Sequence, residues 1–453
     1  LPLPPRTDPA IEEEDLRAHV EALSSDITEG RLTGSPGERI ATSYVARAFR
    51  AVGLEPAGDG GTYFQTFGFT AGISLGPGNR LEVAHGGEEA PLEYPVDSDW
   101  RPFAFSKEGQ VKAAGVVHAG YGIVAPAKEG QRAIDHYEGL DVEGRWVLVF
   151  RLLPSGLSPE SRQHLHRYSS LRHKAMVARD RGALGLLVVS GPNSKVRNQV
   201  APLRFDVSLA GTSIAALSIS DAVASALLEP SGTNLQRLHD QADSTSAVDG
   251  FLLPRVKVSA TIDLEKRRSS GRNVLGRLQM GPEPTPDFIV SGAHVDHLGF
   301  GEGSSSLARE EEKGMVHPGA DDNASGVAAT LEVAEKLASG LSDGELFGKR
   351  DIVFAAWSGE ELGLLGSSWW VDHAADPHSS ENSVAKQVVA YLNFDMVGRM
   401  KDNVTLYGVG SSSIWLEEIE RANVPIGLPV EVQTESILPT CLLYTSPSPR
   451  DRA

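Results

Sequence analysis

The sequence is poor in cysteine and has no long apolar run. Its single cysteine, Cys441, cannot form a disulfide within the chain, and it excludes a metal site built from several thiolates. The longest apolar runs, at 146–150, 184–189 and 352–357, are far shorter than the roughly 20 residues of a membrane-spanning helix. Runs of this length are typical of buried strands, so we expect no membrane span.

Positive charge is also scarce. The chain carries 42 lysine and arginine residues against 60 aspartate and glutamate residues, which gives a net charge of -18. An acidic field of this size repels nucleic acid and anionic membranes, so we expect neither as a partner. The sequence also lacks the glycine-rich P-loop that binds nucleotide phosphates, which argues against an NTPase.

The length of 453 residues exceeds one ordinary hydrophobic core and predicts two domains. We expect a flexible, proline-rich lead-in at 1–12, followed by a discontinuous α/β domain at 13–115 and 262–440. The block at 116–261 reads as a β-rich insert, because it contains several short apolar runs but no pairing of acidic residues and histidine suited to a metal.

Strands and helices alternate after residue 273. The apolar runs predict strands at 274–278, 288–291, 352–357 and 388–394. The spacing of apolar residues over 324–339 predicts a helix. We therefore expect a mixed, mostly parallel sheet flanked by helices. Nearer the N-terminus, the string Ser35-Pro36-Gly37-Glu38 has the pattern of a capping box and predicts the start of another helix.

Histidine and acidic residues follow the ends of the predicted strands. They form four groups, which are His294 with Asp296, Asp321 with Asp322, Glu360 with Glu361, and Asp395 alone. In open α/β sheets, ligands bind beyond the carboxyl ends of the strands. We therefore expect these side chains to meet at one edge of the sheet.

The residue types in these groups point to metal-assisted hydrolysis. Imidazole and carboxylate without thiolate form the ligand set of hydrolytic zinc sites, and one carboxylate can bridge two metal ions. A further carboxylate outside the metal shell is needed to take a proton from the attacking water. Glu360 and Glu361 can supply a ligand and a base, although acidic residues also suit a first helical turn, and Asp321 and Asp322 also suit a helix N-cap.

Four strings in this region resemble the zinc aminopeptidase family M28, which includes bacterial leucyl aminopeptidases. In order, they are Ser-Gly-Ala-His-Val-Asp-His at 291–297, Gly-Ala-Asp-Asp-Asn-Ala-Ser-Gly at 319–326, Trp-Ser-Gly-Glu-Glu-Leu-Gly at 357–363 and Asn-Phe-Asp-Met-Val-Gly at 393–398. The resemblance extends over 13–115 and 262–440 and implies the zinc-dependent exopeptidase fold. The insert at 116–261 resembles a protease-associated domain.

By this resemblance, the chain binds two zinc ions. His294 and Asp395 are expected to bind the first ion and Glu361 the second, while Asp322 bridges both.

The resemblance assigns the remaining roles to two further acids. Glu360 is expected to be the general base, and Asp296 is expected to hold the far nitrogen of His294 and fix its tautomer. The implied activity is that of an aminopeptidase acting on peptides with a free N-terminus. The implied compartment is extracellular or periplasmic. The chain starts Leu-Pro-Leu-Pro-Pro, without an initiator Met or a signal peptide, so we expect a removed leader or a start inside a longer sequence.

The resemblance also implies a second histidine, on the second zinc ion and further along the chain. No histidine follows His378, and the tail at 441–453 has no amphipathic pattern. We therefore expect the native C-terminus and this last ligand to be missing, and the tail to be non-native. Of the other histidines, His297 is expected to be structural or to support a ligand, and His317 could face the site.

Two alternative functions stay open. A carboxypeptidase related to the glutamate carboxypeptidases would need cationic residues to hold the carboxylate of its substrate. A non-catalytic module related to the transferrin receptors would keep the architecture without the metal ligands. The presence of Asp322, Glu360, Glu361 and Asp395 favours an enzyme over such a module.

Overall fold

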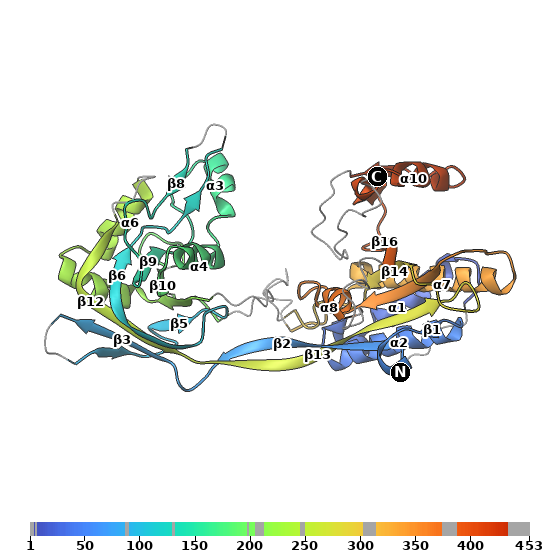
Figure 1. The fold of residues 1–453 in the computed structure, drawn as a ribbon, viewed down its shortest axis with the longest axis horizontal. Helices are drawn as coiled ribbons and strands as arrows, with labels where there is room; N and C mark the ends of the chain where they lie inside the picture. Colours follow the sequence, from blue (N-terminus) through green and yellow to red (C-terminus); the bar gives the residue numbers. More distant parts are fainter. Residues whose placement is uncertain are drawn as a thin grey trace. The chain divides into compact units, whose positions relative to one another are not determined.

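A computed structural model describes most of the chain, and these residues fall into two compact units (Figure 1). The described residues are 4, 7–86, 90–128, 132–196, 199–203, 213–244, 250–301, 314–373 and 387–433. Unit 1 consists of Leu1–Phe69 and Arg268–Ala453, and unit 2 consists of Thr70–Arg267. The tail at 441–453 and His378 lie outside the described residues.

Unit 1 contains a six-stranded mixed sheet. Its strand order is β1-β13-β15-β14-β16, and β2 pairs with β13 beside this path. β14 is parallel to β15 and β16, whereas β13 is antiparallel to β1 and β15. The strands are β1 (Glu55–Pro56), β2 (Phe64–Leu75), β13 (Leu264–Leu278), β14 (Phe288–His294), β15 (Asp351–Trp357) and β16 (Val388–Asn393). The predicted mixed α/β fold is confirmed. Its parallel part is limited to the three strands joined through helices, because parallel strands need long crossover connections.

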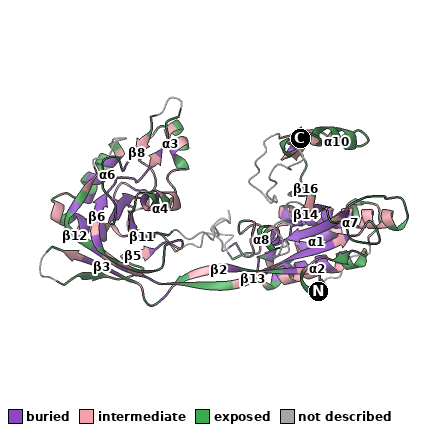
Figure 2. Cartoon of the chain, in the orientation of Figure 1, coloured by how far each residue is buried: buried purple, intermediate pink, exposed green. Residues whose placement is uncertain are grey.

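Helices cover both faces of this sheet. The long helices are α1 (Glu13–Leu23), α2 (Pro36–Ala51) and α7 (Gly326–Ser342), and the shorter α8 is Leu365–His373. Alternate residues of β15 serve opposite faces, as the two-residue repeat of a strand requires. Phe354 packs with the core of α1, α2 and α7, whereas Val353 and Trp357 pack with Trp370 of α8. Figure 2 shows the resulting buried strands between these helices.

The start of α2 has the predicted side-chain cap at Ser35, and the reciprocal bond of Glu38 comes from the residue before the cap. Ser35 Oγ accepts a hydrogen bond from the backbone N–H of Glu38 at 3.2 Å, and Glu38 Oε2 accepts one from the N–H of Gly34 at 3.1 Å. Glu38 Oε1 also accepts a hydrogen bond from Ser358 Oγ at 2.6 Å. The Glu38 side chain is buried, and this burial raises its pKa. The cap therefore fixes α2 directly to the turn that follows β15.

Unit 2 contains an eight-stranded mixed sheet in the order β4-β3-β12-β6-β9-β10-β11-β5. The strands from β6 through β9 and β10 to β11 are parallel, and the outer pairs are antiparallel. Its strands are β3 (Arg80–His85), β4 (Leu92–Tyr94), β5 (Trp100–Pro102), β6 (Gly109–His118), β9 (Trp146–Phe150), β10 (Gly185–Val189), β11 (Ala215–Ile219) and β12 (Phe251–Ile262), with the short pair β7 (Val124–Ala125) and β8 (Ile134–Asp135). Its helices are α3 (Pro159–His166), α4 (Leu171–Asp180), α5 (Asp221–Leu228) and α6 (Leu235–Ser244).

The boundaries of unit 2 differ from the predicted insert at 116–261. β3 and β6 both pair with β12, so residues 70–115 belong with this sheet and not with unit 1. Pairing between strands more than 100 residues apart leaves no local mark in the sequence. The sequence therefore placed the first boundary too late, and the resemblance of this unit to a protease-associated domain stays a prediction.

The last described elements of unit 1 are β17 (Val404–Leu406), α10 (Trp415–Asn423) and β18 (Val430–Val432). β17 and β18 form a parallel pair, and none of the nine residues of α10 is buried. Among all the helices in the described part of the chain, none is both long and apolar enough to cross a membrane.

A buried acid and a buried histidine meet between α1 and α7. His19 Nε2 lies 3.3 Å from Glu332 Oε1, and His19 Nδ1 lies 2.6 Å from Tyr44 Oη. Burial raises the pKa of Glu332 to about 7 and lowers the pKa of His19 to about 4. The folded state therefore favours the neutral form of each group. The free energy of unfolding therefore falls as the pH rises from the ordinary pKa of Glu332 towards 7. It also falls as the pH drops from 6.5 towards 4, because of His19.

We expect Glu332→Gln to raise the free energy of unfolding, and to raise it more at pH 8 than at pH 5. The amide replaces a group that is ionised at pH 8 and still protonated in the folded protein at pH 5. The difference between the two gains should be about 1 kcal/mol, a value reduced for solvent screening. Urea titrations at both pH values measure it, with the exposed Glu345→Gln as the control. Equal gains at pH 5 and pH 8 would contradict the assignment of the raised pKa to Glu332.

Candidate metal centre

The predicted site residues of unit 1 lie at the carboxyl ends of three neighbouring strands. His294 is the last residue of β14, Glu360 and Glu361 follow β15, and Asp395 follows β16. Asp322 lies in the helical turn η5 (Ala320–Ser325), directly before α7. Because β14 is parallel to both neighbours, the three strand ends deliver these side chains to the same edge of the sheet.

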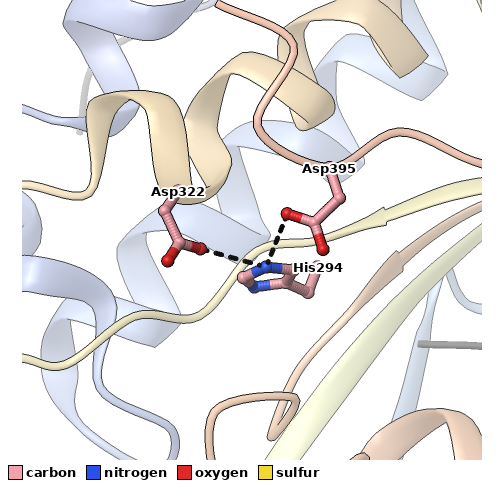
Figure 3. A group of neighbouring side chains, drawn as sticks. All are labelled: His294, Asp322 and Asp395. Atoms are coloured by element: carbon pink, nitrogen blue, oxygen red, sulfur yellow. Dashed lines mark ion pairs between the residues drawn. The ribbon is translucent and has the colours of Figure 1, made fainter. Parts of the chain in front are cut away.

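The first cluster is formed by His294, Asp322 and Asp395 (Figure 3). Nε2 of His294 lies 3.2 Å from Oδ1 of Asp322 and 3.6 Å from Oδ1 of Asp395. Two ligand atoms of one tetrahedral zinc ion, each about 2.0–2.2 Å from the metal, lie about 3.3–3.6 Å apart. The spacing of these three side chains therefore fits one zinc ion.

The second cluster is formed by His297, Asp322 and Glu361. Its three ligand atoms lie within 4.8 Å of one another, and Nδ1 of His297 lies 2.8 Å from Oε1 of Glu361. Asp322 belongs to both clusters, which is the position that a bridging carboxylate must have. The donor set of two imidazoles and three carboxylates, with no thiolate, is that of a hydrolytic zinc centre.

Asp296 faces Nδ1 of His294 with its backbone carbonyl and, farther away, with its carboxylate. Nδ1 of His294 lies 3.2 Å from the backbone carbonyl oxygen of Asp296 but 3.9 Å from the carboxylate. A carbonyl oxygen can only accept, so Nδ1 carries hydrogen and Nε2 faces the two carboxylates of the first cluster. The tautomer is thus fixed by the backbone of Asp296.

The carboxylate of Asp296 instead positions the two glutamates. Oδ1 accepts a hydrogen bond from the N–H of Glu360 at 3.1 Å, and Oδ2 accepts one from the N–H of Glu361 at 3.3 Å. Thr33 Oγ1 donates to Oδ2 at 2.9 Å. The carboxylate is fully buried, and this burial raises its pKa, while the charge of His294 opposes the rise. These contacts hold the carboxylate of Asp296 between Thr33 and the turn that carries the two glutamates.

Glu360 lies beside the first cluster without belonging to either one. Its Oε2 is 4.0 Å from Nε2 of His294, and its side chain is 18% exposed. A carboxylate at this place is close enough to act on a water at the clusters and open enough to exchange protons with solvent.

The loop that carries Asp322 is tied to the loop that carries Asp395. The side chain of Asn323 donates to the carbonyl of Phe394 at 2.9 Å and accepts from the N–H of Met396 at 3.2 Å. Ser325 Oγ accepts from the N–H of Val397 at 3.1 Å. These contacts explain why amide and hydroxyl side chains follow the acidic pair.

Asp321 also ties these two loops together, and its carboxylate belongs to neither cluster. Its Oδ1 accepts from the N–H of Gly398 at 2.8 Å, and its Oδ2 pairs with Nε of Arg399 at 2.5 Å. Of the adjacent acids Asp321 and Asp322, one therefore fixes the loops and the other enters the clusters. The turn directly before Asp321 requires a glycine. Gly319 has φ +58°, and a Cβ on this residue would lie 2.4 Å from the backbone carbonyl of Asp322.

Arg31 is a supporting residue that the sequence did not reveal. Its side chain is 1% exposed and donates four hydrogen bonds to backbone carbonyls. Nε donates to Val295 at 2.8 Å, Nη1 to Leu23 at 2.7 Å and Pro318 at 2.6 Å, and Nη2 to Gly319 at 2.8 Å. The guanidinium therefore joins the loop after β14 to the loop that carries Asp322. It acts 264 residues away along the chain, through carbonyl groups that every residue has, so no local signal marks it.

Arg31 also supplies positive charge behind the clusters. Burial lowers its pKa to about 10, while the charges of Asp296, Asp322 and Glu361 raise it, so Arg31 is a cation at neutral pH. Its charge lowers the electrostatic cost of bringing these carboxylates together.

His294 contributes positive charge beside the carboxylates of the first cluster. Burial alone lowers its pKa, but the hydrogen bonds with Asp322 and Asp395 and the charges of Asp296 and Glu360 raise it well above the usual value. The hydrogen bond from His294 in turn lowers the pKa of Asp322. A cation that binds the first cluster takes the place of the proton on Nε2.

Comparison with known proteins points to a peptidase family. A family model described as "Peptidase family M28" matches residues 273–440, which include every residue of both clusters.

Two curated relatives and one solved structure are similar to most of the chain. A protein named "Aminopeptidase" from Pseudomonas aeruginosa (strain UCBPP-PA14) is 23% identical over 400 residues, which cover 88% of this chain and 59% of that protein. "Probable lipoprotein aminopeptidase LpqL" from Mycobacterium tuberculosis (strain ATCC 25618 / H37Rv) is 24% identical over 423 residues, which cover 91% and 64%. The structure of a zinc aminopeptidase from Bacillus subtilis aligns with 19% identity and a TM-score of 0.45, over 96% of this chain and 83% of that one. The chain thus spans about three fifths of the length of these curated relatives.

We expect Arg31→Met to weaken metal binding at both clusters. The change leaves four backbone carbonyls without their donor and removes the buried positive charge. Zinc affinity, measured by competition with a chelator, should fall at least about tenfold, which corresponds to about 1.4 kcal/mol. Arg31→Lys should recover only part of the loss, because an ammonium group lacks the planar fork of donors. The control is Arg17→Met, which removes an exposed arginine. Unchanged zinc affinity in Arg31→Met would refute this role.

The shared position of Asp322 gives a second expectation. Asp322→Asn should lower the affinity for two zinc ions per chain, whereas Asp395→Asn should chiefly lower the affinity for one, because only Asp322 belongs to both clusters. Metal analysis of the two purified proteins, dialysed against the same zinc buffer, is the measurement. Equal losses in the two variants would argue against a bridge at Asp322.

Proposed function

The chain belongs, through residues 273–440, to peptidase family M28, and from this premise we propose that it is a two-zinc aminopeptidase that removes N-terminal residues from peptides. The observation that carries the proposal is the pair of clusters that share Asp322, with Glu360 beside them and outside both. One bridging carboxylate and one carboxylate base outside the ligand set are the parts that hydrolysis by a metal-activated water requires.

Residues of both clusters would hold the zinc ions. His294 and Asp395 would hold the first ion, Glu361 the second, and Asp322, which belongs to both clusters, would hold both. When bound, the two ions lower the pKa of a water and polarise the carbonyl group of the substrate. The buried contacts behind the ligands keep these side chains in place before a metal or a substrate arrives.

Glu360 moves the proton in the proposed reaction. Its carboxylate accepts a proton from the water as the water oxygen attacks the carbonyl carbon of the first peptide bond. The same proton then passes to the nitrogen of the leaving peptide, which departs as a neutral amine. Its backbone N–H is fixed by Asp296, so the side chain starts from a defined position at the end of β15.

The charge around the site favours a substrate with a free amino group. Carboxylates of both clusters attract a protonated N-terminus, and no acidic group of the substrate is needed. A carboxypeptidase would instead need a free cation. Among the described residues, Arg31 donates to four backbone carbonyls and Arg399 pairs with Asp321, so these two arginines are already engaged. The curated relatives reported above are both named aminopeptidases.

We also propose that the protein works in an extracellular or periplasmic compartment and that unit 2 is a protease-associated domain. The name of the Mycobacterium tuberculosis relative, a probable lipoprotein aminopeptidase, supports the first part. The separate eight-stranded sheet of unit 2 supports the second, because this unit forms a hydrophobic core of its own.

Glu360→Gln is the direct test of the mechanism. The amide keeps the size of the side chain but removes the base, so turnover of leucine p-nitroanilide should fall by roughly 100-fold or more while the zinc content stays near wild type. Glu361→Gln is the matched control and should lose zinc along with activity, because Glu361 belongs to the second cluster. Loss of zinc in Glu360→Gln with retention in Glu361→Gln would mean that the two roles are reversed. Hydrolysis of an N-acetylated reporter as fast as of the free one would refute the aminopeptidase assignment.

A further inference from the structure

We propose that Glu38, in the first turn of α2, is a positioning residue for the reaction and holds, through Ser358, the turn that carries Glu360. The inference rests on the proposed function, because it assumes that Glu360 moves the proton. Glu38 belongs to neither cluster, so its effect on the reaction passes through its hydrogen bond with Ser358.

Glu38 is buried more deeply than a helix cap requires. Its side chain is fully buried, and this burial raises its pKa. Glutamate and glutamine both serve in a capping box, where the side chain reaches back to one N–H at the start of the helix. Burial of a carboxylate is costly unless several donors accompany it. The burial of this acid therefore indicates a task beyond the cap.

Three hydrogen-bond donors from three segments converge on the Glu38 carboxylate. Its Oε1 accepts from Oγ of Ser358 at 2.6 Å and from the N–H of Arg272 in β13 at 2.9 Å. Its Oε2 accepts from the N–H of Gly34 at 3.1 Å. A carboxylate accepts at both oxygens, whereas an amide accepts at one end only. The three donors thus explain why this position holds an acid.

Ser358 connects the Glu38 carboxylate to the turn after β15. It directly follows this strand and is fully buried. Its backbone N–H donates to Oδ1 of Asn273 in β13 at 3.1 Å, and its carbonyl accepts from the N–H of Gly366 in α8 at 2.9 Å. The bond from its hydroxyl to Glu38 adds α2 as a third support. The start of the turn is therefore tied to three elements of unit 1.

The segment before α2 supports the other end of the same turn. Thr33 Oγ1 donates to Oδ2 of Asp296 at 2.9 Å. Asp296 in turn accepts the N–H groups of Glu360 and Glu361 at 3.1 and 3.3 Å. Thr33 and Glu38 thus fix the two ends of one turn to one short segment of the chain. The backbone of Glu360 lies between these two supports.

The alternative is that Glu38 only stabilises unit 1. Ser358→Ala separates the two roles, because it removes the hydroxyl of the turn and leaves Glu38 in place. Tyr63→Phe is the matched control. It removes another buried hydroxyl of unit 1, whose hydrogen bond to the carbonyl of Leu54 is also 2.6 Å long. A purely structural role predicts a loss of stability and an unchanged kcat in both variants.

The experiment uses the full chain in a zinc buffer. It measures kcat and KM for leucine p-nitroanilide, the zinc content, and the hydrogen exchange of the backbone amides at 360–361. We expect Ser358→Ala to lower kcat roughly tenfold or more and to speed the exchange of these amides, because the turn loses one support. Its KM and zinc content should stay near wild type. Tyr63→Phe should show none of these changes.

Two variants of Glu38 complete the test. Glu38→Ala should lower kcat as far as Ser358→Ala, and the double variant should lower it no further, because both changes break the same link. Glu38→Gln should recover most of the kcat lost in Glu38→Ala. Its amide oxygen can accept from Ser358 and Arg272, while its amide nitrogen meets the N–H of Gly34 and lowers stability. Circular dichroism verifies folding, and Ser358→Ala tests the inference even if Glu38→Ala fails to fold.

The inference is overturned if Ser358→Ala has the kcat of wild type, or if it loses zinc, which would place its effect on the ligand Glu361. Unchanged hydrogen exchange at 360–361 overturns it as well. These outcomes are separate from the proposed function. A protein that hydrolyses the reporter equally well without the Ser358 hydroxyl keeps its function and loses this positioning residue. A wild type that hydrolyses no aminoacyl reporter loses the function, and faster exchange in Ser358→Ala but not in Tyr63→Phe then supports the hold of Glu38 on the turn.

Discussion

The repulsion between carboxylates is the constraint on which the arrangement of unit 1 depends. Three strand ends and one helical turn bring five acids to one edge of the sheet, namely Asp296, Asp322, Glu360, Glu361 and Asp395. Like charges at this spacing destabilise a fold unless opposite charge or hydrogen-bond donors accompany them. Arg31 supplies positive charge beside the loops that carry these acids, and His294 supplies positive charge within the first cluster. Backbone N–H groups donate hydrogen bonds to Asp296. The negative charge that these groups do not neutralise is suited to binding metal cations.

Adjacent acids at the site have different roles. Asp321 binds the loop at Gly398, whereas Asp322 belongs to both clusters. Asp296 likewise binds the N–H groups of Glu360 and Glu361 and leaves the ligand position to His294. This division explains why a site with few ligands needs so many acidic residues. The structural acids set the direction of the functional ones, so both kinds contribute to the geometry.

Both imidazoles of the two clusters come from the end of β14 and the loop that follows it, three residues apart. The loop is anchored to Arg31, which also anchors the turn before Asp322. One buried side chain then supports residues of both clusters. Such a centre depends on few segments of the chain, and all of them belong to unit 1. Unit 2 forms its own core, so its contribution to activity is a separate question from the assembly of the metal centre.

The sequence by itself determined the parts that rest on local pattern. Alternating strands and helices, the cap at Ser35 and the acidic residues at strand ends all follow from neighbouring residues, and the structure brings the predicted His294, Asp322, Glu361 and Asp395 together. Their roles as zinc ligands stay predictions. Tertiary structure alone decided the rest: the boundary at Thr70, the use of Asp296, the support by Arg31 and the direction of the His297 ring. Each of these depends on pairing between distant strands or on bonds to backbone groups, and since every residue carries the same backbone groups, such contacts leave no mark in the order of side chains.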